Sequence, residues 1–179
     1  MKTRRMRARW ISDVLRLCTF TECGVEMWRW KTLKPHLSKS KANYKQAMVI
    51  DQALMDELSA KAKANPRLRQ SMDLRNSSDD LSQRMLNALE PGTVMPIHRH
   101  HASSETVVIL RGRIQWVFYD ENGVETENVT LVATGETRML NVERDRWHSL
   151  VCLEEGSVLY ESKDGPYHPL QEDEIMIAK

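Results

Sequence analysis

Residues 92–112 read GTVMPIHRHHASSETVVILRG and place a histidine-rich loop directly before a run of apolar residues. Side chains two apart on an extended chain point to the same side, so His98 and His100 are expected to point together. Glu105 opens the apolar run and can bring a carboxylate to the same interior. Gly112, which lacks a side chain, permits a tight connection into the next strand. The stretch therefore predicts a site where two imidazoles and a carboxylate converge.

A third imidazole is expected from a distant part of the chain. The segment RWHSLVCL, residues 146–153, reads as an apolar strand that carries His148. A lone histidine in such a strand is more often a core residue, but the converging pair at His98 and His100 favours a ligand. Three imidazoles and one carboxylate suit Fe, Zn, Mn, Ni or Cu and leave room for water or substrate. We predict one divalent transition metal and leave its identity open.

The remainder of the chain is typical of an antiparallel β protein that follows one helix. Ile50, Leu54, Leu58 and Ala62 recur every four residues, and Asn65–Pro66 ends this helical pattern. Beyond residue 81, short apolar runs alternate with turn signals such as EPG, DENG and KDGP, which indicates a sandwich or barrel. We expect strands over residues 82–89, 105–110, 113–119, 137–142, 147–153 and 157–162.

Length and composition indicate one folded domain with a basic extension. The 179 residues are 41% hydrophobic and 28% charged, which is ordinary for a globular protein. Residues 1–47 hold 12 Lys and Arg against three acidic residues, whereas residues 48–179 hold 14 against 22. We therefore divide the chain into a basic extension, residues 1–47, and a metal-binding domain, residues 48–179. The extension is a disordered tail for anionic partners, an organelle presequence, or the product of a start assigned upstream of Met48.

Several functional classes are disfavoured. No apolar window reaches 18 residues and no secretory signal pattern is present, so we expect neither a membrane span nor a Sec signal. The three cysteines, Cys18, Cys23 and Cys152, are odd in number and lack metal or redox spacing. We expect reduced thiols and a cytoplasmic location. Nucleic-acid binding is not expected, because the basic charge lies outside the domain and carries no recognised motif.

Polar residues near the expected site are candidates for the pocket. Arg84 and Asn87 lie three apart on one expected strand, so both cannot face inward without a bulge, and strand parity favours Asn87. Cys152 shares the inward face with His148 and is more often a small buried residue than a ligand. Further candidates at the mouth of the pocket are Glu161, Lys163 and Tyr167. No catalytic residue is assigned.

The spacing of the first motif resembles that of the cupins. Gly92, His98, His100, Glu105 and Gly112 match the first cupin motif at every interval. The second motif is partial: Gly135 and His148 are present, but its usual Pro and Gly are absent and the gap is two residues longer. Cys152 stands where Asn is usual.

A narrower resemblance covers roughly Met48 to Pro169. The segments QRMLNALEPGTVMPIHRH, RWHSLVCLEEG and ESKDGPYHP are similar to those of WbuC-type cupin-fold metalloproteins, small bacterial proteins often encoded within O-antigen gene clusters. The resemblance implies a mainly β chain with an N-terminal helix and a single cupin barrel (a double-stranded β-helix, or jelly roll). It also implies a metal held by His98, His100, Glu105 and His148, but it implies no particular reaction.

Two classes of function follow. The first is a metal-dependent enzyme that acts on a small sugar-like or carboxylated metabolite and is linked to O-antigen polysaccharide synthesis. Isomerase, hydrolase and dioxygenase chemistry all remain open. The second is a non-catalytic module that uses the metal to bind or sense a carbohydrate or an anion. A structural zinc is disfavoured because such sites are usually closed and rich in cysteine. The expected partner is a small molecule, and a homodimer is left open.

Overall fold

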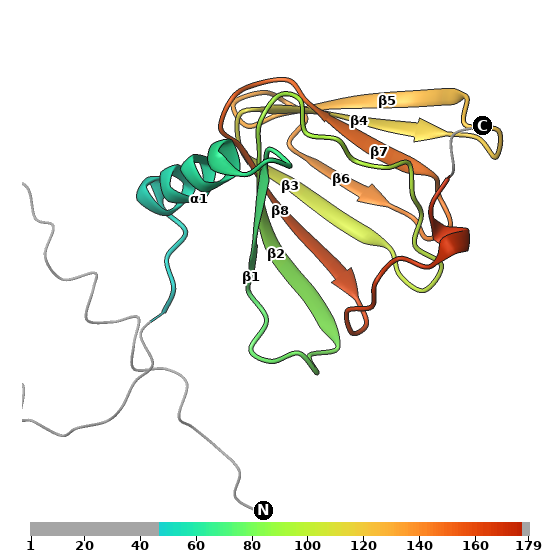
Figure 1. The fold of residues 1–179 in the computed structure, drawn as a ribbon, viewed down its shortest axis with the longest axis horizontal. Coiled ribbons are helices and arrows are strands. Elements are labelled where there is room, and N and C mark those ends of the chain that lie inside the picture. Colours follow the sequence, from blue (N-terminus) through green and yellow to red (C-terminus); the bar gives the residue numbers. More distant parts are fainter. Residues whose placement is uncertain (1–46, 177–179) are drawn as a thin grey trace, which may run out of the picture. The chain divides into compact units, whose positions relative to one another are not determined.

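The computed structural model describes residues 47–176 (Figure 1). One helix precedes eight strands in this part of the chain, and a short 3-10 turn follows them. Most of the predicted basic extension, residues 1–47, lies outside the described residues. The elements are α1 (Gln52–Ala64), β1 (Arg69–Asp73), β2 (Ser82–Leu89), β3 (Glu105–Arg111), β4 (Arg113–Tyr119), β5 (Glu125–Val132), β6 (Met139–Val142), β7 (His148–Cys152), β8 (Ser157–Asp164) and η1 (Glu172–Glu174).

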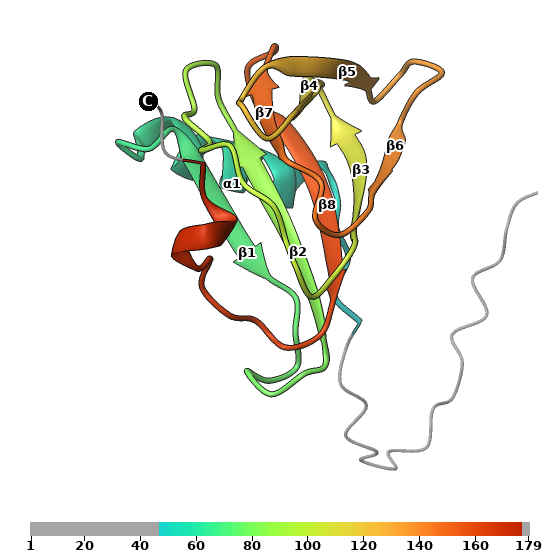
Figure 2. The same ribbon diagram turned by 90° about the vertical axis from the view of Figure 1, so that its right-hand side faces the viewer.

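The strands pair into two antiparallel sheets. The larger sheet has the order β1-β2-β8-β3-β6 and the smaller has the order β5-β4-β7 (Figures 1 and 2). Apolar side chains from both sheets meet in one core, because alternate residues of each strand point inward. The mainly β architecture agrees with the sequence, and closure of the two sheets into a single barrel remains a prediction. The core residues include Leu89, Val107, Ile109, Ile114, Trp116, Phe118, Leu131, Val142, Leu150, Cys152 and Leu159.

Helix α1 forms a third layer against the outer face of the larger sheet. Asp51 caps its first turn by accepting a hydrogen bond from the Leu54 backbone N–H, and Asn65 ends it. Leu58 and Ala62 are buried against the outward-facing residues Leu86, Ala88 and Val158. Ile50 was expected to belong to the buried stripe, but it precedes the N-cap and is exposed. The buried stripe therefore starts one turn later than the sequence pattern suggested.

Six strands lie where the sequence predicts them, with ends that differ by at most two residues. Strands β1 and β5 were not predicted. Both are edge strands: β1 pairs with β2 alone, and β5 pairs with β4 alone. The first four residues of β5 are exposed, and β1 has no fully buried residue. Strands with so few buried residues need no regular series of apolar side chains, and that series is the signal on which strand prediction depends.

Gly112 marks the corner at which the chain crosses from the larger sheet to the smaller. Its φ of +78° lies in the left-handed region, which costs an L side chain strain. An added Cβ would lie 2.9 Å from the Ser157 Cα. Both constraints require glycine at this position, in agreement with the tight connection expected from the sequence. Within residues 47–176, no helix is long and apolar enough to cross a membrane.

Candidate metal centre

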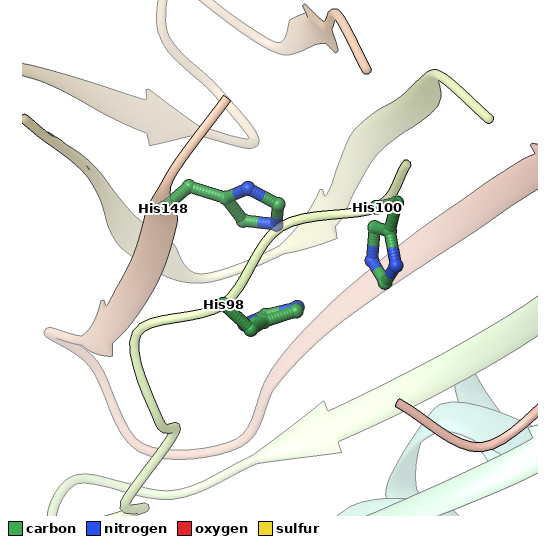
Figure 3. A group of neighbouring side chains, drawn as sticks. All are labelled: His98, His100 and His148. Carbon is green, nitrogen blue, oxygen red and sulfur yellow. The ribbon is translucent and has the colours of Figure 1, made fainter. Parts of the chain in front are cut away.

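His98, His100 and His148 converge between the two sheets (Figure 3). His98 lies on the loop before β3, and His148 is the first residue of β7. Two backbone hydrogen bonds hold these residues side by side, from His98 N to His148 O (2.9 Å) and from His148 N to His98 O (2.8 Å). One nitrogen of each of the three rings lies within 4.8 Å of the others. The H-x-H pair and the distant histidine thus meet as the sequence predicts.

Backbone carbonyls fix which nitrogen of two of the rings faces the site. His98 Nδ1 donates to Pro96 O at 3.0 Å, and His148 Nδ1 donates to Arg146 O at 2.8 Å. In a neutral imidazole this leaves the Nε2 lone pair free to bind a metal. Nε2 of His148 and of His100 are buried and have no hydrogen-bond partner among the described residues. Buried acceptors without partners are costly, and a metal ion would satisfy them.

Two of the rings, those of His98 and His148, are held in the neutral form that binds metal. Burial, together with the neighbouring His148 ring, lowers the pKa of His98 to about 3. Burial also lowers the pKa of His148. Both imidazoles are therefore neutral near pH 7, and a metal ion would displace no proton from them.

Glu105 brings a buried carboxylate to the same point. Its Oε2 lies 3.3 Å from His100 Nε2 and 3.8 Å from His148 Nε2, and it has no aligned hydrogen-bond donor. Burial alone would raise the pKa of Glu105, but the Lys163 ammonium and the nearby imidazoles outweigh it and hold the pKa below its usual value. The carboxylate thus lies beside His100 and His148, whereas the ligand atoms that all lie within 4.8 Å of one another belong to the three histidines.

A chain of polar groups, mostly half-buried, continues from Glu105 through β8 and β2 to Ser71 on β1. Lys163 Nζ lies 3.2 Å from Glu105 Oε2 and 2.7 Å from Glu161 Oε1. Asn87 Nδ2 donates to Glu161 Oε2 at 3.0 Å, and Ser71 Oγ donates to Asn87 Oδ1 at 2.5 Å. Burial raises the pKa of Glu161, and the charge of Glu105 adds to this effect. Burial alone would lower the pKa of Lys163, but the two carboxylates outweigh it and raise the pKa.

These residues line one cavity of about 430 Å³, which falls in the range of small-molecule sites. The proposed ligands share it with Asn87, Glu161, Lys163 and the exposed Tyr167. Trp116, which sequence reasoning did not single out, stacks on His148 with ring centroids 5.7 Å apart. Its only sequence signal is an inward position on a strand, which any core tryptophan shares.

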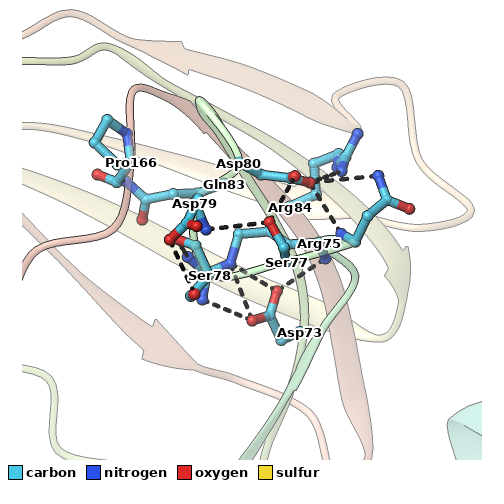
Figure 4. Close-up of polar contacts among 10 residues, drawn as sticks. Asp73, Arg75, Ser77, Ser78, Asp79, Asp80, Gln83, Arg84 and Pro166 are labelled. Atoms are coloured by element: carbon cyan, nitrogen blue, oxygen red, sulfur yellow. Dashed lines mark hydrogen bonds and ion pairs between the residues drawn. The ribbon is translucent and has the colours of Figure 1, made fainter.

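Two of the candidate residues lie away from the cavity. Arg84 points to the opposite face of β2 and pairs with Asp80 at 2.8 Å (Figure 4), as strand parity indicated. Cys152 belongs to the core, where its Sγ donates to Leu89 O at 3.4 Å and to Glu154 O at 3.1 Å. Burial raises the pKa of this thiol, which keeps it protonated. Cys152 thus occupies the place of a small core residue.

Sequence reasoning also missed the C-terminal residues that hold the histidine loop. Arg99 N donates to Glu174 O at 3.0 Å, and His101 N donates to Glu174 Oε1 at 3.1 Å. Met176 N donates to Ile97 O at 2.9 Å. The loop that carries His98 and His100 is thereby tied to residues 171–176. Glu174 is buried, although its neighbours in the sequence are acidic and suggest a solvated turn.

Comparisons with known proteins support the fold. Residues 50–131 match a family described as a domain of unknown function (DUF6016), and no curated protein matches the chain. The capsular polysaccharide assembling protein CapF from Staphylococcus aureus is similar in structure, with a TM-score of 0.50 and 17% identity. That match covers 60% of this chain but only 29% of CapF. At this identity the likeness concerns the fold alone.

Two further structures are similar at lower scores. KdgF from Halomonas sp. is 16% identical, with a TM-score of 0.46, over 57% of this chain and 84% of KdgF. A cupin-2 domain protein from Shewanella frigidimarina is 21% identical, with a TM-score of 0.41, over 53% of this chain and 79% of that protein.

Proposed function

We propose that the protein binds one divalent transition metal through His98, His100, His148 and Glu105, and that the cavity above the metal takes a small polar metabolite. The observation that carries this proposal is the convergence of three imidazoles beside a buried carboxylate, with Nε2 of His100 and of His148 lacking hydrogen-bond partners among the described residues. Three nitrogens and one carboxylate oxygen suit Fe, Zn, Mn or Ni.

The residues around the site have separable roles in this proposal. The carbonyls of Pro96 and Arg146 orient two of the rings. Trp116 and Leu150 contribute apolar surface to the cavity wall. Lys163 holds the Glu105 carboxylate in place through their ion pair. When bound, the metal would supply a Lewis acid with open positions for an oxygen atom of the metabolite.

The metabolite is proposed to be sugar-like or carboxylated. The motif resemblance to WbuC-type proteins supports a link to O-antigen polysaccharide synthesis, and that link is part of the proposal. Catalysis and metal-dependent binding both fit the cavity. Elemental analysis of protein purified without chelator, followed by a turnover screen with the metal found, separates them. Iron would favour oxygen chemistry, whereas zinc or manganese would favour hydrolysis or isomerisation.

Metal content of single variants tests the ligand set. We expect His98→Ala, His100→Ala and His148→Ala each to lose stoichiometric metal, and Glu105→Ala to lose less, because water can replace a carboxylate. His101→Ala is the matched control, since that ring contacts Asp145 and Asp173 outside the cavity. Mass spectrometry of the metal bound to each purified protein gives the answer. Full occupancy in His148→Ala would contradict the proposed ligand set.

A further inference from the structure

Two arginines beside β1 line the same cavity as the proposed metal ligands. Arg69 is the first residue of β1, and Arg67 lies two residues before it. The Arg69 side chain is half-buried, and its Nη1 lies 3.1 Å from Met95 Sδ, a weak acceptor. Among residues 47–176, neither guanidinium forms an ion pair with a carboxylate. Both therefore keep donors available to a ligand.

At the turn that joins β1 to β2, by contrast, the arginines form ion pairs with carboxylates. There Arg75 Nη2 lies 2.7 Å from Asp73 Oδ2, and Arg84 Nη2 lies 2.8 Å from Asp80 Oδ2 (Figure 4). Those two arginines lie outside the cavity, and each has an acidic partner. Within the described part of the chain, the two arginines near these strands that lack acidic partners, Arg67 and Arg69, are the two that line the cavity.

The charges inside the cavity do not compensate Arg67 and Arg69. The carboxylates that line the cavity are Glu105 and Glu161, and Lys163 contacts both of them. The two guanidiniums therefore leave the cavity with excess positive charge, and a divalent metal would add to it. A cleft lined by one sign of charge concentrates ions of the opposite sign. Guanidinium groups bind carboxylate and phosphate oxygens through paired hydrogen bonds.

The rest of the lining suits hydroxyl groups. Gln83 and Ser103 face the cavity with an amide and a hydroxyl, and both residues are mostly buried. The Gln83 amide nitrogen donates to Pro166 O at 3.3 Å, which orients its side chain. Trp116 and Met85 add apolar surface, on which the carbon skeleton of a sugar-like molecule can pack. This combination of a few oriented polar groups on an apolar wall is typical of small-molecule sites.

We propose that the cavity binds a small polyhydroxylated anion, whose carboxylate or phosphate is held by Arg67 and Arg69 while its other oxygens reach the metal centre. This inference rests on the proposed metal site and specifies the class of metabolite. It also gives Arg67 and Arg69 the role of specificity determinants.

Calorimetric titration of the full-length, metal-loaded protein tests the inference. The probes are gluconate, sorbitol 6-phosphate and sorbitol, because sorbitol is a neutral polyol with the same six-carbon skeleton. We expect at least one anion to bind about tenfold or more tightly than sorbitol. The double variant Arg67→Met/Arg69→Met should lose that preference and keep its metal. Arg113→Met, which removes an exposed arginine outside the cavity, should retain the preference.

The outcomes separate this inference from the proposed function. Three results would overturn the arginine site. The first is equal affinity for sorbitol and both anions, and the second is an unchanged anion preference in the double variant. The third is no binding of either anion up to about 10 mM. A preference for gluconate alone or for sorbitol 6-phosphate alone identifies the anionic group. If the wild-type protein holds no metal, the proposed function fails. An anion preference that the double variant abolishes would then still support the arginine site.

Discussion

The buried imidazole of His98 makes the metal-free protein less stable in acid. Because burial lowers the pKa of His98 to about 3, its ring stays neutral in the folded state while the unfolded chain takes up a proton near pH 6.5. The unfolded state therefore binds more protons below pH 6.5, and folding stability falls as the pH drops towards 3. The lowered pKa of His148 acts in the same direction, whereas the raised pKa of Glu161 acts in the opposite direction.

Comparison with a variant isolates the contribution of His98. Between pH 7 and pH 5, we expect chelator-treated wild-type protein to lose about 2 kcal/mol of stability relative to His98→Leu. Urea unfolding of both proteins at the two pH values gives this difference. An identical pH dependence of the two proteins would mean that the His98 ring titrates normally in the folded state.

Asn87 supports the buried carboxyl of Glu161. The substitution Asn87→Leu removes the donor to Glu161 Oε2, and an unsatisfied buried polar group costs about 1–3 kcal/mol. We expect that loss in urea unfolding, together with unchanged metal content and weaker binding of any cavity ligand. Gln115→Leu is the control, because its amide donates to Asn128 on an exposed surface at 3.2 Å. If both variants lost the same amount of stability, Asn87 would contribute no more than an exposed amide such as Gln115.

At the scale of elements, the β3–β4 corner depends on Gly112. Gly112→Ala adds left-handed strain and brings its Cβ to 2.9 Å from the Ser157 Cα, whereas Gly165→Ala adds strain alone, since nothing lies within 4 Å of its Cβ. We expect Gly165→Ala to cost about 1 kcal/mol and Gly112→Ala about 3 kcal/mol or more in chemical unfolding. If the two losses matched, close packing at the corner would not be the constraint.

The C-terminal segment supports the loop that carries His98 and His100. Glu174→Ala removes the acceptor of the His101 backbone N–H, so the loop should lose its fixed geometry. We expect metal affinity to fall about tenfold, as when other supporting partners of metal ligands are removed. The exposed neighbour Glu172 provides the control variant Glu172→Ala. Competition with a chromophoric chelator measures both affinities, and equal values would show that Glu174 does not position the loop.

The elements that the sequence predicts are those with a regular apolar pattern. Strand β4 alternates inward Ile114, Trp116 and Phe118, and its position was predicted residue for residue. Strand β1 and the segment around Glu174 carry no such pattern. Hydrogen bonds to partners far away in the sequence hold them in place, and the local sequence does not reveal those partners. For the same reason, Arg67 and Arg69 could not be assigned to the cavity. Only the pairing of β1 with β2 brings them there.

At the scale of the whole molecule, the candidate site joins the two sheets. His148 belongs to the smaller sheet, whereas Glu105 and Lys163 belong to the larger one. A metal bound by His148 and Glu105 would therefore link the layers, and its binding energy would add to folding stability. The H-x-H spacing and strand parity could bring His98 and His100 to one side, and the apolar run around His148 suggested the third imidazole. The sequence could not show that Lys163 forms an ion pair with Glu105, because that contact depends on the register of β3 against β8.

The described residues contain a complete core, so we expect a shortened protein that begins at Met48 to keep its fold and its metal. Helix α1 buries Leu58 and Ala62 against the larger sheet with contacts supplied by residues 52–160. The removed part carries 12 Lys and Arg against three acidic residues, and such self-repulsion opposes compaction. A loss of stability on shortening would follow if the removed residues covered an apolar depression. That depression is lined by Ile50, Met55, Val108, Leu110 and Tyr160. Thermal unfolding at equal metal occupancy decides the matter. A melting temperature within about 3 °C of the full-length value supports the boundary at Met48, whereas a larger decrease would make residues 1–47 part of the folded unit.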